Sequence, residues 1–205
     1  ILKWLENSKE NILNIDNLSY AANLRNLEVI ESDPRYSFIK TDIQNQNEIT
    51  EIIKELKPRA ILNFAAESHV DRSIEGPESF INTNILGTYS LLEASLNYWN
   101  ELDESDEKIF RFFHISTDEV FGSLNLNEKK STENSSYKPN SPYSASKAAS
   151  DHLVRAWHHT FKLPTLVSNC TNNYCPHQHE EKLITLVITK DLKNENLQKY
   201  GDAKK

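Results

Sequence analysis

Tyr143 and Lys147 stand four residues apart at the start of a segment with helical character, so both side chains project from one helix face. A nearby ammonium stabilises a phenolate. We therefore expect Lys147 to lower the pKa of Tyr143 enough for the phenol to act as a general base. A Tyr and a Lys at this spacing also occur on ordinary solvated helices. The pair is therefore evidence for a catalytic site only together with the α/β pattern of the elements around it.

A second group of candidate residues, Thr117, Asp118 and Glu119, follows the apolar run 110–116. Adjacent carboxyls in different environments can divide into an acid and a base, and the preceding Thr can hydrogen-bond a substrate oxygen. The alternative is a solvated turn or a helix cap. The sequence leaves both open at this point.

Asp16 ends the apolar run 11–16 and matches the acid that binds the adenosine ribose in dinucleotide-binding folds. An Asp at that place favours NAD over NADP, because it would repel a phosphate on the same ribose. The Gly-rich turn expected one helix before it is not found, and none of the chain's four Gly residues is available to form it. Alone, Asp16 is a weak signal.

The elements that must position these residues alternate along the chain. Strands are predicted at 11–16, 36–42, 60–66, 110–116 and 165–169, and helices at 1–7, 48–56, 77–99, 142–161 and 182–192, with a polar loop at 124–140. This order predicts parallel βαβ units and a doubly wound α/β domain, whose ligand lies beyond the carboxyl ends of the strands.

Two of these elements carry finer predictions. The near-continuous apolar run 60–66 is typical of a strand that is covered on both faces. In the segment 77–99, helical spacing places Ile81, Ile85, Leu92 and Leu96 on one side.

Composition excludes several classes of protein. The chain has 205 residues, 38% of them hydrophobic, which is ordinary for a globular protein, and its net charge of −7 argues against a nucleic-acid binder. No apolar run approaches a membrane span, and the first residues do not form a signal peptide. Two cysteines indicate a reducing compartment, so we expect a cytoplasmic protein. The Cys175–His179 stretch lacks the further ligand that a metal site needs, so no metal is expected.

Several segments form a set with a fixed order and spacing: AAESHVDRS at 65–73, TNILGT at 83–88, HISTDEVFG at 114–122, SPYSASK at 141–147, DHLVRA at 151–156, and the stretches 169–174 and 181–184. Together they resemble the dTDP-glucose 4,6-dehydratases, which are extended short-chain dehydrogenases/reductases. The resemblance runs from Asp16 to about Asp202. Nucleotide-sugar epimerases on this fold share the Tyr and Lys but usually lack the Asp-Glu pair.

The resemblance implies a Rossmann-like NAD-binding domain and a role for each matching position. Contacts to NAD are implied for Asp16, Asn17, Leu18, Ser19, Asp42, Ile43, Phe64, Ala65, Ala66, Glu67, Ser68, Thr83, Tyr143, Lys147 and Asn173. Contacts to the nucleotide sugar are implied for Ser68, Thr117, Asn172, Lys182 and Leu183, and catalytic roles for Thr117, Asp118, Glu119, Tyr143 and Lys147.

The resemblance also implies the reaction. Tyr143 would take the proton of the C4 hydroxyl of dTDP-glucose while hydride passes to NAD. Glu119 would then remove the C5 hydrogen, and Asp118 would protonate the departing C6 hydroxyl. Return of hydride to C6 and of a proton to C5 would give dTDP-4-dehydro-6-deoxy-glucose. The two carboxyls would serve the elimination.

Some positions depart from the family pattern: Cys175 stands where a Gly is expected, Glu180 where a Pro is expected and Phe121 where a Tyr is more usual. None of them removes a catalytic group. We expect residues 1–175 to be an NAD-binding domain without its first strand and Gly-rich turn, and residues 176–205 to begin a sugar-nucleotide domain. Such a fragment alone is expected to be inactive. The helices at 77–99 and 142–161 are candidates for pairing in a homodimer.

Other functions remain open. One is a dehydratase or epimerase for UDP- or CDP-sugars, because most of the nucleotide-base pocket would lie beyond Lys205. Another is a non-catalytic remnant that binds a dinucleotide. Titration with NAD followed by a turnover assay separates these functions.

Overall fold

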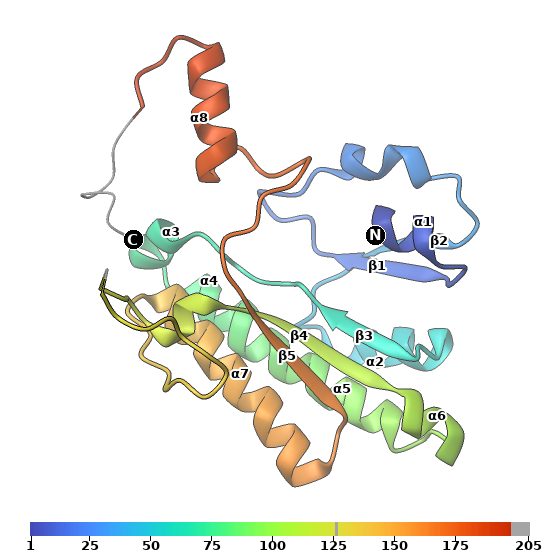
Figure 1. Ribbon diagram of the computed structural model, residues 1–205. Helices are drawn as coiled ribbons and strands as arrows, with labels where there is room; N and C mark the ends of the chain where they lie inside the picture. The colour runs from blue at the N-terminus through green and yellow to red at the C-terminus, as the bar shows by residue number, and fades with distance from the viewer. Residues whose placement is uncertain (126, 198–205) are drawn as a thin grey trace. The chain divides into compact units, whose positions relative to one another are not determined.

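The computed structural model describes residues 1–125 and 127–197 (Figure 1). Its strands are β1 Ile12–Asp16, β2 Tyr36–Lys40, β3 Ala60–Asn63, β4 Arg111–Thr117 and β5 Thr165–Cys170. Its α-helices are α1 Leu2–Asn7, α2 Gln46–Leu56, α3 Val70–Glu75, α4 Glu78–Phe80, α5 Thr88–Trp99, α6 Glu104–Ile109, α7 Pro142–Phe161 and α8 Leu183–Leu192. Two short 3₁₀ helices, η1 Leu24–Ile30 and η3 Asp118–Phe121, and the π-helix η2 Ile81–Gly87 complete the order.

The chain divides into two compact units. The first contains residues 1–12, 18–37 and the described residues from 172 onward, and the second contains residues 13–17 and 38–171. Each unit is described on its own below.

Strands β3, β4 and β5 form a parallel sheet in that order, while β1 pairs with β2 in a separate sheet. Asn63 at the end of β3 lies opposite His114, and Thr117 at the end of β4 lies opposite Cys170 of β5. The prediction of an α/β fold with parallel strands is confirmed. The carboxyl ends of these three strands therefore meet at one edge.

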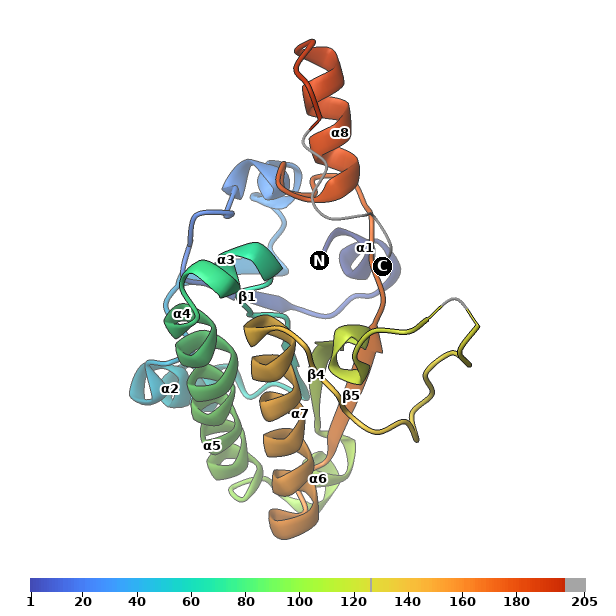
Figure 2. The ribbon, with the colours of Figure 1, turned by 90° about the vertical axis from the view of Figure 1, so that its left-hand side faces the viewer.

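The core of the second unit lies between β4 and helices α2, α5 and α7. Figure 2 shows α5 and α7 side by side. The buried core consists of Ile49, Ile53, Leu91, Leu92, Ala94, Tyr98, Phe110, Phe112, Val154 and Leu163. Burial of this apolar surface is the main force that holds α7 against the sheet.

Helix α7 begins and ends as its sequence predicts. Ser141 and Ser144 form a reciprocal capping box, in which the Ser141 hydroxyl accepts from the Ser144 N–H at 3.0 Å and the Ser144 hydroxyl accepts from the Ser141 N–H at 2.9 Å. Pro142 occupies the first turn, where its missing N–H costs nothing. The helix closes on Lys162, whose φ of 66° is left-handed.

The prediction that the run 60–66 is covered on both faces was wrong. Strand β3 ends at Asn63, and Leu62 remains 42% exposed. Leu62 lies opposite Phe113, which in turn lies opposite Leu166, another exposed residue. These side chains form a row on the sheet face away from the buried Phe112, because the helices that build the core pack on the other face.

The prediction for the segment 77–99 was only partly right. Leu92 is fully buried, but Ile81 is 48% exposed. The reason is the π-helix Ile81–Gly87, whose i→i+5 hydrogen bonds widen each turn and rotate Ile81 away from the α-helical stripe.

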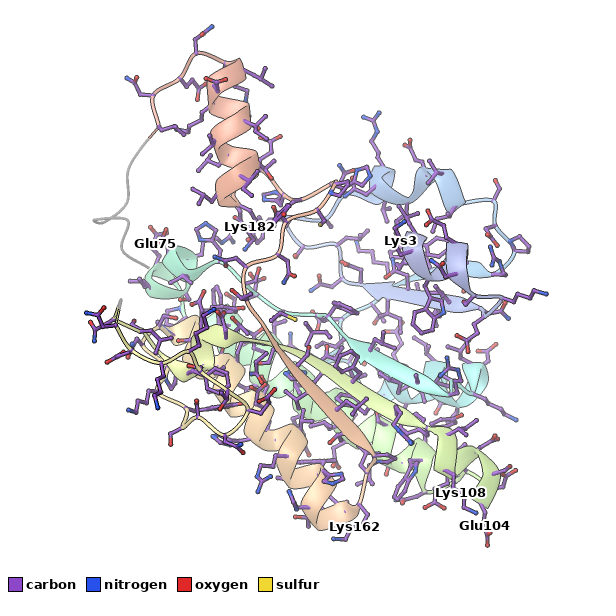
Figure 3. All side chains as sticks on the ribbon, viewed as in Figure 1. Lys3, Glu75, Glu104, Lys108, Lys162 and Lys182 are labelled. Atoms are coloured by element: carbon purple, nitrogen blue, oxygen red, sulfur yellow. The ribbon has the colours of Figure 1, made fainter. Side chains whose placement is uncertain are left out.

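Four short helices were not predicted: η1, η3, α3 and α6. Each has an N-cap side chain that accepts a backbone N–H of its first turn: Asn23, Thr117, His69 and Asp103. Asp103 caps α6 by accepting from the N–H groups of Ser105 and Asp106 at 2.9 and 3.0 Å. Glu104 and Lys108, labelled in Figure 3, add a solvated ion pair of 3.8 Å on the same helix.

Gly122 is the residue on which the turn after η3 depends. Its φ is +85°, and a Cβ at this position would clash with the backbone oxygen of Lys138. The Lys138 N–H also donates to the Val120 oxygen at 2.9 Å, so the loop closes tightly on η3.

We expect Gly122→Ala to lower the free energy of unfolding by about 1–3 kcal/mol, because the new Cβ meets both strain and a backbone clash. Urea titration followed by circular dichroism measures the change. Gly76→Ala is the control: the nearest atom to its Cβ is 4.0 Å away, and the change should stay within about 0.5 kcal/mol. Equal losses in the two variants would contradict this account of the turn.

Candidate active site

Thr117 ends β4 and begins η3, which carries the two candidate carboxyls. Its buried hydroxyl accepts from the Glu119 N–H at 3.2 Å, and its backbone oxygen accepts from Asn169 Nδ2 at 3.2 Å. Asp118 is exposed, whereas Glu119 is half-buried. The structure thus places two adjacent carboxyls in different surroundings at the edge where a ligand is expected.

Tyr143 lies in the first turn of α7, with its ring edge-on to Phe80 at a centroid distance of 6.3 Å. Burial raises the pKa of Tyr143 to about 12; the Thr117 hydroxyl opposes the rise, and the charges of Glu119, Asp118 and Asp151 add to it. The expectation that Lys147 lowers the pKa of this phenol was therefore wrong. Burial is the main cause of the rise, and the Lys147 ammonium contacts the Ile115 oxygen and His114 instead of the phenol.

Lys147 is buried, and its ammonium is directed into the protein. Nζ donates to the Ile115 oxygen at 2.7 Å and lies 3.5 Å from His114 Nε2. Burial lowers the pKa of Lys147 to about 8, and the charge of Asp151 opposes this shift. A substantial fraction of Lys147 is therefore still charged near neutral pH.

Asp16, Asn17 and Asp42 lie at the ends of the two-stranded sheet. Asp42 is half-buried: its Oδ1 accepts from the Gln44 N–H at 2.8 Å, and its Oδ2 accepts from Asn17 Nδ2 at 2.9 Å. Burial alone would raise the pKa of Asp42, but these bonds and one from the Gln44 amide outweigh it and hold the pKa below its usual range. The Ile43 side chain is buried against Gly87, and Asp16 is exposed.

Residues 64–68 form a loop beyond β3 rather than part of the strand. Phe64 is 68% exposed, and the Ala65 N–H donates to Asn63 Oδ1 at 3.2 Å. The buried Asn84 holds Glu67 by two hydrogen bonds: its Oδ1 accepts from the Glu67 N–H at 2.9 Å, and its Nδ2 donates to the Glu67 oxygen at 3.0 Å. Of the other expected residues nearby, Ala66 and Thr83 are half-buried and Ser68 is exposed.

Asn84 is a positioning residue to which the sequence analysis assigned no role. Its Nδ2 also lies 2.9 Å from the Ser146 hydroxyl, next to Lys147 on α7. A buried side chain thereby joins the loop after β3 to the helix with the catalytic candidates. The only signal in the sequence was its place inside the TNILGT segment.

The remaining candidates belong to the first unit. Leu18 has a φ of 57°, and Ser19 is exposed. Asn172 and Asn173 are exposed, and the backbone oxygen of Asn173 accepts from Gln178 Nε2 at 2.9 Å. Lys182, labelled in Figure 3, precedes α8, whose first residue is the exposed Leu183.

Within the described residues, no helix is both long and apolar enough to cross a membrane. The same part of the chain contains no group of three or more His, Cys, Asp or Glu side chains arranged to hold a metal ion.

Comparison with known proteins gives a consistent picture. The sequence profile described as "GDP-mannose 4,6 dehydratase" matches residues 1–205. The dTDP-glucose 4,6-dehydratase of Haemophilus influenzae is 52% identical over 97% of the chain and 59% of its own length. That of Xanthomonas campestris is 55% identical over 94% of the chain and 55% of its own length.

A solved structure shows the same likeness in space. The dTDP-glucose 4,6-dehydratase DesIV of Streptomyces venezuelae, crystallised with NAD bound, superimposes with a TM-score of 0.87 at 40% identity, over 98% of this chain and 58% of that one. The chain therefore spans somewhat more than half the length of the relatives it matches.

The low pKa of Lys147 predicts how stability depends on pH. Between about 8, the folded value, and 10.5, the unfolded value, the unfolded chain binds a proton that the folded protein has lost. The contribution of Lys147 to the free energy of unfolding should therefore rise with pH in this window. Relative to Lys147→Met, the protein should gain about 2 kcal/mol between pH 8 and pH 10.

Urea unfolding at several pH values measures this difference, and the exposed Lys129→Met is the control. A pH-independent difference between the protein and Lys147→Met would show that Lys147 titrates normally in the folded state.

Proposed function

Because this chain belongs to the GDP-mannose 4,6-dehydratase family, we propose that its complete protein is an NAD-dependent dTDP-glucose 4,6-dehydratase. The observation that carries the proposal is the pair of carboxyls on η3, Asp118 and Glu119, whose charges act on the half-buried phenol of Tyr143. Relatives at about half identity that bear this name support it. The activity is assigned to the complete protein, since the chain spans 59% of the Haemophilus relative.

The residues at the strand ends fit a dinucleotide. Asp16 follows β1 at the place of the acid that binds the ribose in dinucleotide-binding folds, and Asp42 is held as an anion with Asn17 beside it. An acid at Asp16 favours NAD over NADP. The loop 64–68 and Thr83, with Ser19, Leu18, Ile43 and Asn173, complete the proposed contacts. Bound NAD would supply a hydride acceptor for the first step and a hydride donor for the last.

The chain's own groups move the protons. Tyr143 takes the proton of the C4 hydroxyl, and Lys147 is the cation on the same helix face that assists it. Thr117, buried beside Tyr143, hydrogen-bonds the sugar, and Ser68, Asn172, Lys182 and Leu183 are proposed to contact the nucleotide sugar. With a folded pKa of about 12, Tyr143 holds its proton until a ligand changes the charge around it.

The second half of the reaction removes water from C5 and C6. Half-buried Glu119 takes the C5 proton, and exposed Asp118 gives a proton to the leaving C6 hydroxyl. Return of the hydride to C6 and of a proton to C5 would then give the 4-keto-6-deoxy sugar, so the net change in the sugar is the loss of one water. An epimerase, even one acting on UDP- or CDP-sugars, needs no such pair, and the two carboxyls therefore favour the dehydratase.

We also propose that the two sheets belong to one doubly wound sheet. Its usual strand order is 3-2-1-4-5-6, so the separate sheets β2-β1 and β3-β4-β5 leave the place of one strand between β1 and β3. A first strand followed by a Gly-rich turn would fill it. Residues 1–175 then form the NAD-binding domain and residues 176–205 the start of the sugar-nucleotide domain, and residues 1–205 alone would be inactive.

The exposed apolar side chains Leu86, Tyr89 and Phe161, on η2, α5 and α7, favour a homodimer that pairs these helices. The free thiols of Cys170 and Cys175 agree with a reducing compartment, so we place the enzyme in the cytoplasm.

Tyr143→Phe in the complete protein should lower kcat by a factor of roughly 100 or more, because it removes a positioned proton acceptor. Its circular dichroism should be unchanged, and NAD should still bind by titration. Tyr36→Phe, which alters a phenol at the start of β2, is the control and should keep normal turnover. Normal turnover of the Tyr143 variant would rule out this residue as the base.

The double variant Asp118→Asn, Glu119→Gln tests the dehydratase against an epimerase. Amides keep the shape of the side chains but do not exchange protons at neutral pH. In a single turnover with dTDP-glucose, we expect NADH absorbance and a 4-keto sugar to build up while the C6 hydroxyl stays in place.

The matched control is Asp106→Asn, Glu107→Gln, another adjacent acidic pair, on α6. It should form product at the normal rate. Dehydrated product at the parental rate from the Asp118/Glu119 variant would show that this pair is only a solvated turn.

A further inference from the structure

Behind Lys147 lies a buried polar cluster to which the proposed mechanism gives no role. Its centre is Asp151, one helical turn after Lys147 on α7 and almost fully buried. His114 of β4, which is completely buried, lies beside both residues. Buried ionisable groups are costly, so their partners need a full account.

One carboxylate oxygen of Asp151 collects three donors from three different segments. Oδ2 accepts from the Ser116 hydroxyl of β4 at 2.7 Å, from the Tyr137 hydroxyl of the loop at 2.8 Å, and from Asn169 Nδ2 of β5 at 3.3 Å. Ser116 and Asn169 lie opposite each other in the sheet, next to Thr117. Asp151 therefore fastens α7 to the ends of β4 and β5.

The other oxygen, Oδ1, lies 3.4 Å from His114 Nε2. Asn63 Oδ1 accepts from the Ala65 N–H, so its Nδ2 is the group facing His114 Nδ1 at 3.2 Å. That ring nitrogen is then the acceptor, and Nε2 carries the hydrogen. Burial lowers the pKa of His114, with Asp151 opposing, so the ring is neutral near pH 7.

This tautomer excludes a proton relay through the ring. Lys147 Nζ and Asp151 Oδ1 both approach the same nitrogen, Nε2, at 3.5 and 3.4 Å. A relay would need them on opposite nitrogens. His114 is therefore a neutral spacer between a cation and an anion.

We propose that Asp151 is a positioning residue of the active site: its buried carboxylate is the counter-charge of the Lys147 ammonium across His114, and its hydrogen bonds fix the strand ends that carry Thr117. The proposal rests on the function given above, in which Lys147 must be a cation. Without the anion, a buried ammonium held by one backbone oxygen would lose its proton more readily.

Other charged groups around Lys147 do not replace Asp151. His114 from β4 is neutral, and Tyr143 on the same helix is a phenol. Asp118 and Glu119 of η3 act on Tyr143. The charged residues of α3 and α4, which also contact α7, are exposed: Asp71, Arg72, Glu75 and Glu78. Within the described residues, Asp151 is the charge that raises the pKa of Lys147.

The test is an NMR titration of the complete protein labelled with carbon-13 at lysine Cε, with the Lys147 signal assigned by its loss in Lys147→Arg. Asp151→Asn keeps an oxygen for the three donors but removes the charge. The pKa of Lys147, about 8 in the protein, should fall by about one unit or more. Asp151→Glu, which retains the charge, should restore most of it.

Two controls separate charge from packing. Tyr137→Phe removes one hydrogen bond to Asp151 but no charge, and Asp106→Asn removes an exposed charge on α6. Both should leave the pKa of Lys147 within about 0.3 units of the parental value, well below the shift expected from a nearby charge. An unchanged Lys147 in Asp151→Asn, or an equal fall in Tyr137→Phe, would overturn the proposal.

If Asp151→Asn does not fold, a measurement on the unaltered protein tests the same proposal. The carboxyl carbon of Asp151 should show an inflection at the pH where Lys147 titrates, because the two charges interact. A flat signal there would overturn the proposal. Neither titration depends on turnover. The role of Asp151 and the proposed dehydratase activity can therefore each fail without deciding the other.

Discussion

A buried ammonium is the constraint around which this part of the chain is organised. Lys147 lies under the edge of the sheet, where water does not compensate its charge, and burial of a lone cation would cost several kcal/mol. The fold compensates this cost by placing the Ile115 oxygen at 2.7 Å from the ammonium, with the neutral imidazole of His114 and the carboxylate of Asp151 nearby. The buried carboxylate needs hydrogen-bond partners of its own, and these come from segments far from Lys147.

The carboxylate illustrates how far the requirement extends. To hold Asp151, the protein uses a hydroxyl from β4, an amide from β5 and a phenol from the loop before α7. That phenol, Tyr137, precedes Lys138, whose backbone closes on Gly122 behind η3. The charge of Lys147 is thus linked, through contacts that are each short, to the turn that presents Asp118 and Glu119. The hydrogen-bond network that compensates this one buried cation therefore also makes the carboxyl edge of the sheet rigid.

The sequence predicted the elements whose signals are local and regular. Helix α7 has a proline in its first turn, and its bounds Pro142–Phe161 are those predicted. The π-helix before α5 could not be predicted, because the spacing of apolar residues does not determine which backbone N–H and C=O groups pair. Leu62 was misjudged for another reason: an apolar strand shows that something can cover it, not that a described segment does.

The candidate site divides in the same way. Residue types and spacing placed Thr117 and the carboxyls at a strand end and placed Tyr143 and Lys147 on one helix. The direction of the pKa shift of Tyr143 could not be predicted from its spacing to Lys147, because it depends on burial and on charges from η3. Asn84 and Asp151 lie within the segments that resemble the family. Their hydrogen-bond partners, Ser146 and Ser116, lie 62 and 35 residues away in the chain, so the sequence did not indicate these contacts.

The raised pKa of Tyr143 and the roles of the carboxyls fit together in one further respect. Burial moves Lys147 and Tyr143 toward their neutral forms, to about 8 and about 12, and the charges of Glu119 and Asp118 push the phenol further in that direction. An anionic Asp118 would therefore oppose the loss of the phenol proton. An acid that serves the C6 hydroxyl, however, must carry its proton before it gives it up. In the proposed reaction, a proton on Asp118 would remove its contribution to the raised pKa of Tyr143, so the form of the site that prepares the elimination would also ease the oxidation that precedes it.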